Sequence, residues 1–557
     1  MQQQQLHSID YIVFLIYFVI VSSYGYWVYN RKKKALQDSK DFFLAEGSLT
    51  WWAIGASLIA SNISAEQFIG QSGSGFKMGL AIATYEWMAA ATLLVVAIFF
   101  MPIYLKNKIY TMPQFLTQRY SSTVSTIMAV FWLLLYVIVN LTSILFLGAL
   151  AINTISGINF WVCMGGLALF AIVITLGGMK VIGYTDVIQV FFLILGGLAT
   201  TYMALNMVSE HFGTSGVFNG FNLMMDHGND HFHMLFRQGN PNYLDLPGLS
   251  ILLGGMWIVN LNYWGCNQYI TQRALGADLP TARNGILFAA FLKLLMPVIV
   301  VLPGIAAYVL YQEGMFQSEM QSNGALNPDR AYPILLNLLP IGLKGLSFAA
   351  LTAAIVASLA GKANSISTIF TLDIYKKFFN PAATEKHLVH VGKIAIMVAM
   401  GLAIVISPFM GIDKKGGFQF IQEYTGFVSP GIFAIFILGF FWKKTTAKAA
   451  LVAAVIVFPL SMFLKVLPNY TDLSALSGFG LAAINNDSGL YEIPFIDRMG
   501  LVFLVVVAVM VVVSLADTKA EPKGLEIDAS MFKPKGAFAV GAVIVCGILA
   551  ALYTIFW

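Results

Sequence analysis

The chain has 557 residues, of which 58% are apolar and only 11% are Asp, Glu, Lys or Arg, and its net charge is +5. Soluble domains carry about 25% charged residues, so this composition excludes a soluble globular protein. It also excludes disordered, collagenous and coiled-coil chains. The small positive charge does not indicate a nucleic-acid partner. The three cysteines are scattered in apolar stretches and indicate neither a disulfide framework nor a metal site.

Apolar runs of roughly 18–25 residues recur along the whole chain, and each is long enough to cross ~30 Å of hydrocarbon. They predict an all-α polytopic membrane protein with about fourteen transmembrane helices. The first run is expected to be a span and not a cleaved signal peptide, because its basic residues follow it. The predicted spans are 10–29, 50–76, 80–104, 122–153, 160–178, 186–207, 248–267, 285–310, 343–371, 388–407, 418–441, 447–466, 495–515 and 536–556.

The loops between these spans differ in charge. Alternate loops hold basic clusters such as Arg31–Lys34, Lys106 with Lys108, and Lys533 with Lys535, whereas the opposite loops hold few basic residues. The positive-inside rule predicts that the basic loops are cytoplasmic. Both termini are therefore expected on the outer side, and an even number of spans agrees with that arrangement.

Polar residues inside the spans cost free energy in a bilayer, so each one indicates a candidate functional position. Two clusters, SNISAEQ at 61–67 and NLNYWG at 260–265, lie five spans apart. Unwound backbone at this depth occurs only where it is buried in protein or lines a cavity. Matching interruptions in two halves predict an inverted-repeat transporter with its site at the midplane. The alternative is ordinary interhelical hydrogen bonding with glycine-mediated packing.

Five longer blocks carry a family resemblance. They are DFFLAEGSLTWWAIGASLIASNISAEQFIGQSGSG from residue 41, TYEWM from 84, TDVIQVFFL from 185, YWGCNQYITQR from 263 and FIQEYTGFVSPGIFAIFILGFFWKKTT from 420. The chain resembles the solute:sodium symporter family, and within it the sodium-coupled sugar transporters. The resemblance implies a LeuT-like core with a five-plus-five inverted repeat at 50–441, divided into repeats at about 50–207 and 248–441. Residues 1–49 would add one helix before this core, and residues 442–557 would add three after it.

The resemblance also implies a substrate site and its gates. Tyr263 would stack on the sugar ring as the inner gate, while Gln71, Tyr85 and Phe418 would form the outer lid. The sugar-contacting residues would be Gln67, Glu86, Asn260, Lys293 and Gln422.

The chemistry of these residues agrees with that assignment. Amides can donate to or accept from a hydroxyl, an acidic and a basic residue add charge-assisted bonds without net charge, and an aromatic ring offers a flat apolar face. These candidate residues include no Arg that could grip a carboxylate bidentately, which argues against acidic substrates. The alternative for Glu86 and Lys293 is a purely structural ion pair. Ala89 stands where the sugar-transporting relatives have a serine, which removes one hydroxyl partner for galactose and leaves the hexose class intact.

The sodium site implied by the resemblance is incomplete in this chain. Its ligands would be the carbonyls of Ala60, Ile63 and Ala354 and the hydroxyl of Ser358, but Ala357 stands where the family usually has a second serine. Asp186 corresponds to a carboxylate on the ion's cytoplasmic exit route.

Lys362 is a second departure from the family. It lies one helical turn beyond Ser358, at a position that is usually apolar in the related symporters. We expect it to lie between the sodium site and Asp186 and to pair with Asp186. The alternative is that its ammonium group reaches toward the cytoplasm.

Three functions are compatible with these features. The first is sodium-coupled symport of a neutral hexose of the galactose or glucose class in the bacterial plasma (inner) membrane. The second keeps the fold but is proton-coupled or a uniporter, because of Ala357 and Lys362. The third, an enzyme or sensor, has little support, since the spans hold no Cys, His and Asp grouping that could activate a nucleophile. The expected partners are the sugar, sodium as the coupling ion and the lipid bilayer, with no organic cofactor and no nucleic acid.

Overall fold

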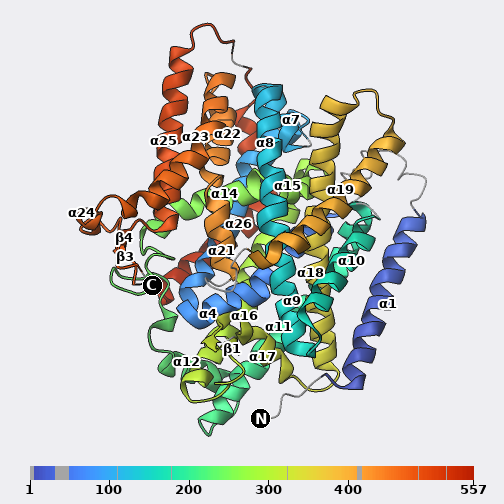
Figure 1. The fold of residues 1–557 in the computed structure, drawn as a ribbon, viewed down its shortest axis with the longest axis vertical. Coiled ribbons are helices and arrows are strands. Elements are labelled where there is room, and N and C mark those ends of the chain that lie inside the picture. The colour runs from blue at the N-terminus through green and yellow to red at the C-terminus, as the bar shows by residue number, and fades with distance from the viewer. Residues whose placement is uncertain are drawn as a thin grey trace.

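The computed structural model describes residues 6–31, 49–109, 111–176, 179–322, 324–409, 417–486, 488–521 and 523–557, and it is almost entirely helical (Figure 1). Several residues that oriented the predicted spans lie outside this range, namely Lys32, Lys33, Lys34, Lys40, Lys414 and Lys415.

The helices of the N-terminal half include short π-helical and 3₁₀ turns, which are labelled η. They are α1 (Ser8–Arg31), α3 (Trp51–Asn62), η1 (Glu66–Gln71), α4 (Ser72–Met78), η2 (Gly79–Ala83), α5 (Thr84–Val95), η3 (Val96–Phe100), α6 (Met101–Lys106), α7 (Met112–Arg119), α8 (Ser122–Leu134), η4 (Leu135–Leu141), α9 (Thr142–Ser156), α10 (Phe160–Thr175), α11 (Met179–His211), α12 (Val217–His227), η5 (Asn229–Phe232), α13 (Ser250–Leu253), α14 (Gly255–Gly265) and α15 (Gln268–Leu275).

The C-terminal half continues with the helices α16 (Leu279–Gln312), η6 (Pro328–Arg330), α17 (Ala331–Asn337), α18 (Leu343–Thr368), η7 (Ile369–Phe379), α19 (Glu385–Ile406), η8 (Ser407–Phe409), α21 (Gly417–Gly426), α22 (Ser429–Phe441), α23 (Ala447–Val466), η9 (Leu467–Asn469), α24 (Ser474–Ser477), α25 (Phe495–Ala516), η10 (Ala529–Phe532) and α26 (Gly536–Ile555). Two short antiparallel hairpins accompany them. One pairs β1 (Gln321–Ser322) with β2 (Ala325–Leu326), and the other pairs β3 (Ala483–Ile484) with β4 (Tyr491–Glu492).

The described residues contain nine helices that are long and apolar enough to cross a membrane, or ten if α21 and α22 form one span bent by 52°. The predicted count of fourteen is therefore not confirmed. One of the nine runs from Glu66 to Lys106 over 41 residues, about twice the length that a bilayer requires. It contains Gly79 at φ +70°, a conformation that favours glycine, between the two spans predicted for this region.

The predicted interruption of the second span is present. Helix α3 ends at Asn62, Ile63 adopts an extended conformation, and a helix resumes as η1 at Glu66. The Ser64 hydroxyl and backbone N–H form bonds at this break, and its residues are buried. An interruption buried within protein satisfies the rule for unwound backbone at membrane depth.

The interruption of the seventh span lies elsewhere than predicted. Residues 260–265 are helical and form the end of α14, and the break follows at Cys266 and Asn267. The helix tolerates Asn260 because its side-chain amide donates to the carbonyl of Met256 one turn earlier. The break comes where Asn267 caps α15, with its side-chain oxygen accepting from the Tyr269 N–H at 3.2 Å.

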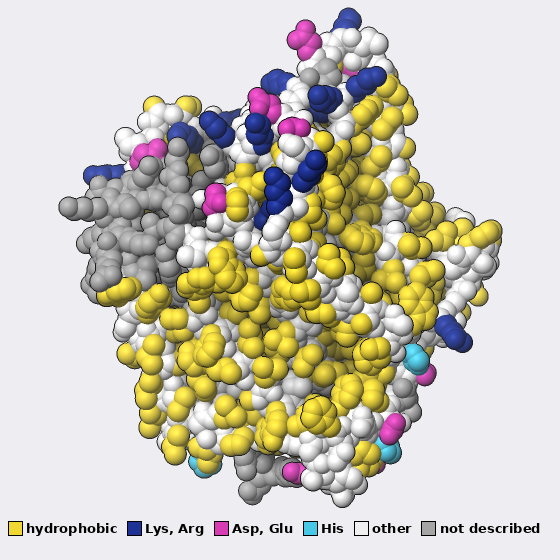
Figure 2. Space-filling model, turned by 180° about the vertical axis from the view of Figure 1, so that it is seen from behind, with side chains coloured by type: hydrophobic (Ala, Val, Ile, Leu, Met, Phe, Trp, Pro, Cys, Tyr) yellow, Lys and Arg dark blue, Asp and Glu magenta, His cyan; other side chains and the backbone are white. Residues whose placement is uncertain are grey.

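Close helix packing surrounds both breaks. Helix α16 contacts α3, α4, α5 and α11, while α18 contacts α11, α10 and α1. Glycines permit this approach, since a Cβ added at Gly304 would lie 2.1 Å from the Ser72 carbonyl oxygen. On the face drawn in Figure 2, apolar side chains cover the middle and Lys and Arg gather at one end.

Candidate functional site

A small cavity of about 70 Å³ lies among the two breaks and the helices around them. The five predicted sugar-contacting residues line it, together with the predicted stacking residue Tyr263 and two of the predicted outer-gate residues: Gln67, Glu86, Asn260, Lys293, Gln422, Tyr263, Tyr85 and Phe418. Glu66 and Lys362 also line this deep cavity. Ligand pockets typically enclose about 300–1,000 Å³, so the deep cavity is contracted in this conformation.

A buried ion pair lines the deep cavity. The Lys293 ammonium donates to the Glu86 carboxylate, and both residues are at most 3% exposed. Lys293 also donates to the Asn62 side-chain carbonyl, and the Asn62 amide donates to the Tyr263 hydroxyl at 3.2 Å. The pair is thus connected through Asn62 to the aromatic ring that was predicted as the inner gate.

The amides around the pair are partly engaged with the protein. Gln67 Oε1 accepts from the Ser64 backbone N–H at 3.0 Å. Asn260 Nδ2 donates to the Met256 carbonyl at 3.2 Å. The remaining donor of Gln67 and acceptor of Asn260 are the atoms that a ligand could use, and Gln422 adds a half-buried amide to the same wall.

The predicted outer gate is only partly assembled at the cavity. The rings of Tyr85 and Phe418 meet edge to face, with centroids 4.9 Å apart. Gln71, in contrast, is fully buried within η1, is not part of the cavity lining, and its amide has no hydrogen-bond partner among the described residues. Because a Cβ at Gly70 would lie 2.7 Å from the Phe418 backbone nitrogen, η1 and α21 close directly over the cavity.

Asp329 holds this closure in place, although the sequence analysis did not identify it. Its carboxylate accepts from the Gly417 backbone N–H at 2.8 Å, immediately before Phe418. It also packs against Gly73 of α4, where a Cβ would lie 2.4 Å from Oδ1. Asp329 belongs to a loop outside the membrane-spanning helices, and burial raises its pKa to about 7 against the opposing effect of the Gly417 bond.

At the first break, the backbone carbonyls of two predicted sodium ligands, Ala60 and Ile63, lose their helical hydrogen bonds. In an uninterrupted α-helix the Ser64 N–H would bond the Ala60 carbonyl, and the Gln67 N–H would bond the Ile63 carbonyl. Here the Ser64 N–H donates to the Gln67 side chain, and the Gln67 N–H donates to the Ser64 carbonyl. The Ala60 and Ile63 carbonyls are therefore without their helical partners.

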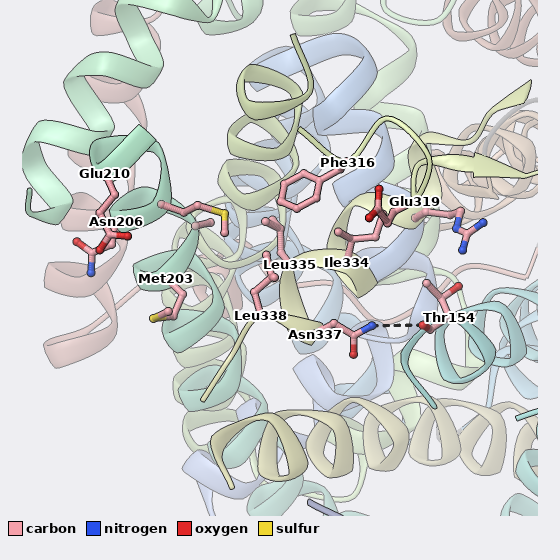
Figure 3. Close-up of a pocket in the computed structure, with 13 residues that line it drawn as sticks. Thr154, Met203, Asn206, Glu210, Phe316, Glu319, Ile334, Leu335, Asn337 and Leu338 are labelled. Atoms are coloured by element: carbon pink, nitrogen blue, oxygen red, sulfur yellow. Dashed lines mark hydrogen bonds between the residues drawn. The ribbon is translucent and has the colours of Figure 1, made fainter. Parts of the chain in front are cut away.

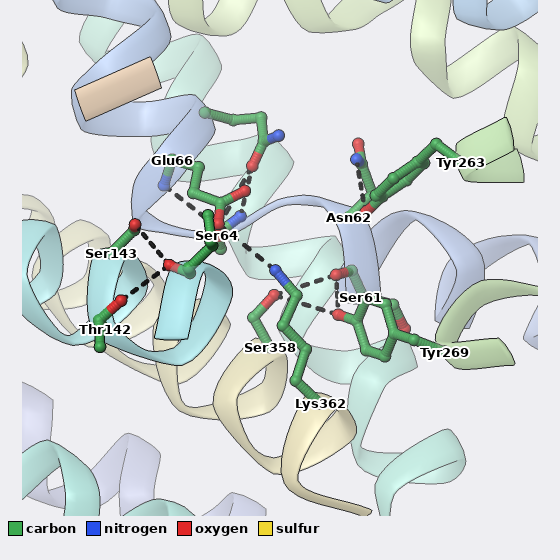
Figure 4. Close-up of polar contacts among 12 residues, drawn as sticks. Ser61, Asn62, Ser64, Glu66, Thr142, Ser143, Tyr263, Tyr269, Ser358 and Lys362 are labelled. Atoms are coloured by element: carbon green, nitrogen blue, oxygen red, sulfur yellow. Dashed lines mark hydrogen bonds and ion pairs between the residues drawn. The ribbon is translucent and has the colours of Figure 1, made fainter. Parts of the chain in front are cut away.

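The side chains from α18 and α15 converge on the same break (Figure 4). The Ser358 hydroxyl donates to the Ser61 carbonyl at 3.0 Å, and the Tyr269 hydroxyl donates to that carbonyl as well. Ala354 and Ala357 lie on the same buried helix as Ser358. Of the four predicted sodium ligands, Ala60 and Ile63 lie at the end of α3 and Ala354 and Ser358 lie on α18, and these two helices meet at the break.

The predicted pairing of Lys362 with Asp186 is wrong. Lys362 turns toward the break and the deep cavity, where its ammonium lies 3.4 Å from Glu66 Oε1 (Figure 4). Asp186 instead accepts from the Ser57 hydroxyl at 2.7 Å and lies 4.0 Å from the Arg273 guanidinium. Helix α15 inserts Arg273 between helices at 4% exposure.

A larger cavity, of about 570 Å³, is separate from these residues (Figure 3). Its wall comes from α9, α11, α17 and the segment before α17, and it includes none of the predicted site residues. Met203, Leu335 and Leu338 make much of the wall apolar. Size therefore does not identify the candidate site, which is the smaller cavity where the predicted polar residues meet.

Comparison with known proteins identifies the family of this chain. The model of the sodium:solute symporter family matches residues 42–457. The chain belongs to this family. Family membership and the long apolar helices make it a multi-pass membrane transporter.

Individual relatives extend over most of the chain. A sodium/glucose cotransporter of Vibrio parahaemolyticus is 47% identical over 99% of both chains. Sodium/myo-inositol cotransporter 2 of Sus scrofa is 34% identical over 80% of this chain and 68% of its own. Sodium/glucose cotransporter 1 of Ovis aries is 32% identical over 81% and 71%.

A solved structure confirms the predicted fold class. A Na⁺-coupled sialic acid symporter in a substrate-bound, outward-open state superposes with a TM-score of 0.74. The match covers 93% of this chain and 99% of that chain at 20% identity. At this identity the likeness concerns the fold alone, which is the all-α, LeuT-like fold expected for this symporter.

Proposed function

We propose that this symporter carries a neutral hexose of the galactose or glucose class and couples its movement to sodium by alternating access. The observation that carries the proposal is the deep cavity, in which the Glu86–Lys293 pair, three amides and Tyr263 meet. The pair adds no net charge, and hydroxyls can bond to both of its members. The name and extent of the Vibrio relative support the same substrate class.

The first break offers a physical route for coupling. Sodium would bind the released carbonyls of Ala60 and Ile63, together with the Ala354 carbonyl and the Ser358 hydroxyl. Asn62 lies between the first two carbonyls in the chain and bonds both Lys293 and Tyr263. An ion that orders this backbone would therefore also order the sugar site.

The contracted cavity fits a closed intermediate of such a cycle. A volume of about 70 Å³ is smaller than typical ligand pockets, so the helices must separate to admit a sugar. Tyr85 and Phe418 would separate on the outer side, and Tyr263 would move on the inner side. Asp186, held by Arg273, would lie on the route by which the ion leaves.

A second candidate keeps the fold and changes the coupling. Lys362 places an ammonium beside the break, and Ala357 removes one hydroxyl from the ion site. In this alternative the Lys362 ammonium substitutes for sodium, which would give proton-coupled transport or uniport. The observation that favours it is the position of Lys362 in the wall of the deep cavity.

One experiment separates these candidates. Purified protein in proteoliposomes is assayed for counterflow of labelled glucose and galactose with and without sodium, and with an imposed proton gradient. Sugar exchange that requires sodium supports the proposal. Exchange that is indifferent to sodium supports the alternative, and an absence of exchange under every condition contradicts both.

The proposal includes an orientation and a domain organisation. The gathering of Lys and Arg at one end of the molecule (Figure 2) fits a cytoplasmic face, with both termini on the outer side of a bacterial plasma membrane. The transport core would be residues 50–441 with repeats at about 50–207 and 248–441. Residues 1–49 and 442–557 would add flanking helices.

A further inference from the structure

The cavity of about 570 Å³, hereafter the interface cavity, lies where three long helices end. In its wall, Thr154 belongs to the last turn of α9, Glu210 belongs to the last turn of α11, and Leu338 lies between α17 and α18. Helices α9, α11 and α18 belong to segments that are long and apolar enough to cross a membrane. Because such segments end where hydrocarbon gives way to water, the interface cavity lies at the depth of the lipid headgroups.

Three buried polar atoms in the interface cavity lack partners. They are Arg330 Nε, the Thr154 hydroxyl oxygen and Asn337 Oδ1, and none has a hydrogen-bond partner among the described residues. The Asn337 amide nitrogen donates to the Thr154 backbone carbonyl at 3.3 Å, which brings two of these side chains together (Figure 3). Unpaired buried atoms cost free energy, which a ligand that accepts from Arg330 and donates to Asn337 would recover.

Charges of opposite sign meet at the same end of the interface cavity. Burial lowers the pKa of the Arg330 guanidinium, and the nearby Glu319 carboxylate counteracts that effect. Figure 3 shows Glu319 on the same side of the cavity as Thr154, whereas Glu210 lies on α11 at the opposite side. A ligand that carries an anionic group beside a cationic one would match Arg330 and Glu319 together.

The remaining wall is largely apolar and continues onto the surface of α11. Phe316, Leu335 and Leu338 lie between the polar end and that helix (Figure 3). One face of α11 carries large apolar side chains about one turn apart, each 38–59% exposed: Phe191, Leu195, Leu198 and Tyr202. Asn206 of the cavity wall continues this spacing. An exposed apolar stripe on a membrane-crossing helix faces acyl chains, so a chain lying on this stripe leads to the cavity.

We propose that the interface cavity binds a membrane phospholipid whose headgroup carries a phosphate and a primary ammonium, as in phosphatidylethanolamine. Arg330 Nε and the Thr154 hydroxyl would donate to the phosphate oxygens. The ammonium would donate to Asn337 Oδ1 and to the Glu319 carboxylate. The volume of about 570 Å³ suits a headgroup, while the acyl chains would lie along the exposed stripe of α11.

Other common headgroups match the interface cavity less well. A choline headgroup carries a phosphate, but its quaternary ammonium has no N–H to donate to Asn337 or Glu319. A glycerol headgroup carries a phosphate and no cation, so its negative charge would face Glu210 and Glu319 with only Arg330 to offset them. The lining therefore favours the headgroup that has both charges and N–H donors.

Lipid binding to the full chain tests this proposal. The detergent-solubilised chain is titrated separately with dioleoyl phosphatidylethanolamine, phosphatidylcholine and phosphatidylglycerol, and native mass spectrometry counts the lipids bound. We expect one tight site for phosphatidylethanolamine, with an affinity at least tenfold higher than for either of the others. Arg330→Gln and Glu319→Gln should each weaken that site at least tenfold. Arg237→Gln and Glu313→Gln change exposed loop residues outside the lining, so these matched controls should bind as the wild type does.

A variant that gains a preference guards against misfolding. Glu319→Lys removes an acceptor for the ammonium and adds a second cation near Arg330. It should therefore bind phosphatidylglycerol at least tenfold more tightly than phosphatidylethanolamine. A misfolded chain does not produce this reversal.

Several results would overturn the inference. They are equal affinity of the wild type for the three lipids, a wild-type preference for phosphatidylglycerol, and unchanged affinity in Arg330→Gln and Glu319→Gln. Water-soluble phosphoethanolamine that binds as tightly as the lipid would overturn the membrane source. The titration contains neither sugar nor sodium, so its outcome does not depend on the proposed function.

Discussion

Two carboxylate–ammonium pairs face the same deep cavity, and they differ in setting. Glu86 and Lys293 lie in direct contact, and Lys293 bonds a third residue, Asn62. Glu66 and Lys362 are 3.4 Å apart beside the break that would bind sodium. The first pair is thus part of a hydrogen-bond chain toward Tyr263, the ring proposed to stack on the sugar, whereas the second would neutralise a cation that would otherwise repel the proposed sodium ion. Under the proposed function, similar residue types would serve the substrate in one place and the ion site in the other.

The largest effect should come from breaking the first pair. Glu86→Ala leaves Lys293 buried without its carboxylate, and removing one partner of a buried pair costs about 3–5 kcal/mol. We expect sugar binding to be abolished. Gln422→Ala should abolish binding as well while leaving both pairs intact, which controls for loss of fold. Isothermal titration with glucose and galactose measures both, and wild-type affinity in either variant would contradict the site.

The second prediction concerns the other pair. At ~6 Å and an effective dielectric near 20, two unit charges repel by roughly 3 kcal/mol, about a hundredfold in affinity. Lys362→Met combined with Ala357→Ser removes that charge and restores a hydroxyl, so the sodium concentration for half-maximal uptake should fall by up to about a hundredfold. Lys362→Arg retains the charge, so the sodium concentration for half-maximal uptake should stay high. Glu66→Gln leaves Lys362 without its carboxylate and should weaken sodium further.

Sodium titrations of sugar uptake in proteoliposomes decide this prediction. If the Lys362→Met, Ala357→Ser variant and the wild type share one sodium dependence, Lys362 does not influence the ion site. In that event the difference between the two pairs is one of position alone.

A smaller effect is expected at Tyr263, which the first pair reaches through Asn62. Tyr263→Phe loses one hydrogen bond, at a cost of about 0.5–1.5 kcal/mol, and should retain much of the transport. Tyr263→Ala also loses the ring and should lose most of it. Initial uptake rates compare the two variants. Equal losses would show that the hydroxyl, and not stacking, is what matters.

The smallest effect concerns Asp329 above the cavity. Burial raises its pKa from 3.8 to about 7, so in the folded state the carboxyl holds its proton to higher pH than in the unfolded state. Folding stability therefore falls as the pH rises from about 4 through 7. Asp329→Asn keeps an acceptor for Gly417 and should raise the melting temperature by a few degrees at about pH 8, with little change at about pH 5.

A matched control for Asp329 is available in the exposed outer loop. Asp245→Asn removes a carboxylate that is paired with Lys77 near the surface, where such pairs contribute little. Its melting temperature should show no comparable pH-dependent difference from wild type. A flat pH profile for the wild type would contradict the assignment of Asp329.

Composition and pattern determined the class and most of the candidate site. Low charge and long apolar runs require a helical membrane protein, because backbone groups in lipid must bond within their own segment. The polar residues that interrupt those runs are costly in a bilayer, so they indicated the cavity. Glu86, Lys293, Tyr263 and Gln422 meet there as expected.

Only the tertiary structure decided which charges pair. Lys362 and Glu66 are 296 positions apart, and the sequence predicted Asp186 as the partner of Lys362 instead. Helix α15 settled the choice by bringing Arg273 to Asp186. The location of the second break and the role of Asp329 likewise depend on neighbouring helices. Hydropathy and periodicity report whether a residue is buried, whereas the identity of its partner depends on how distant helices rotate and pack.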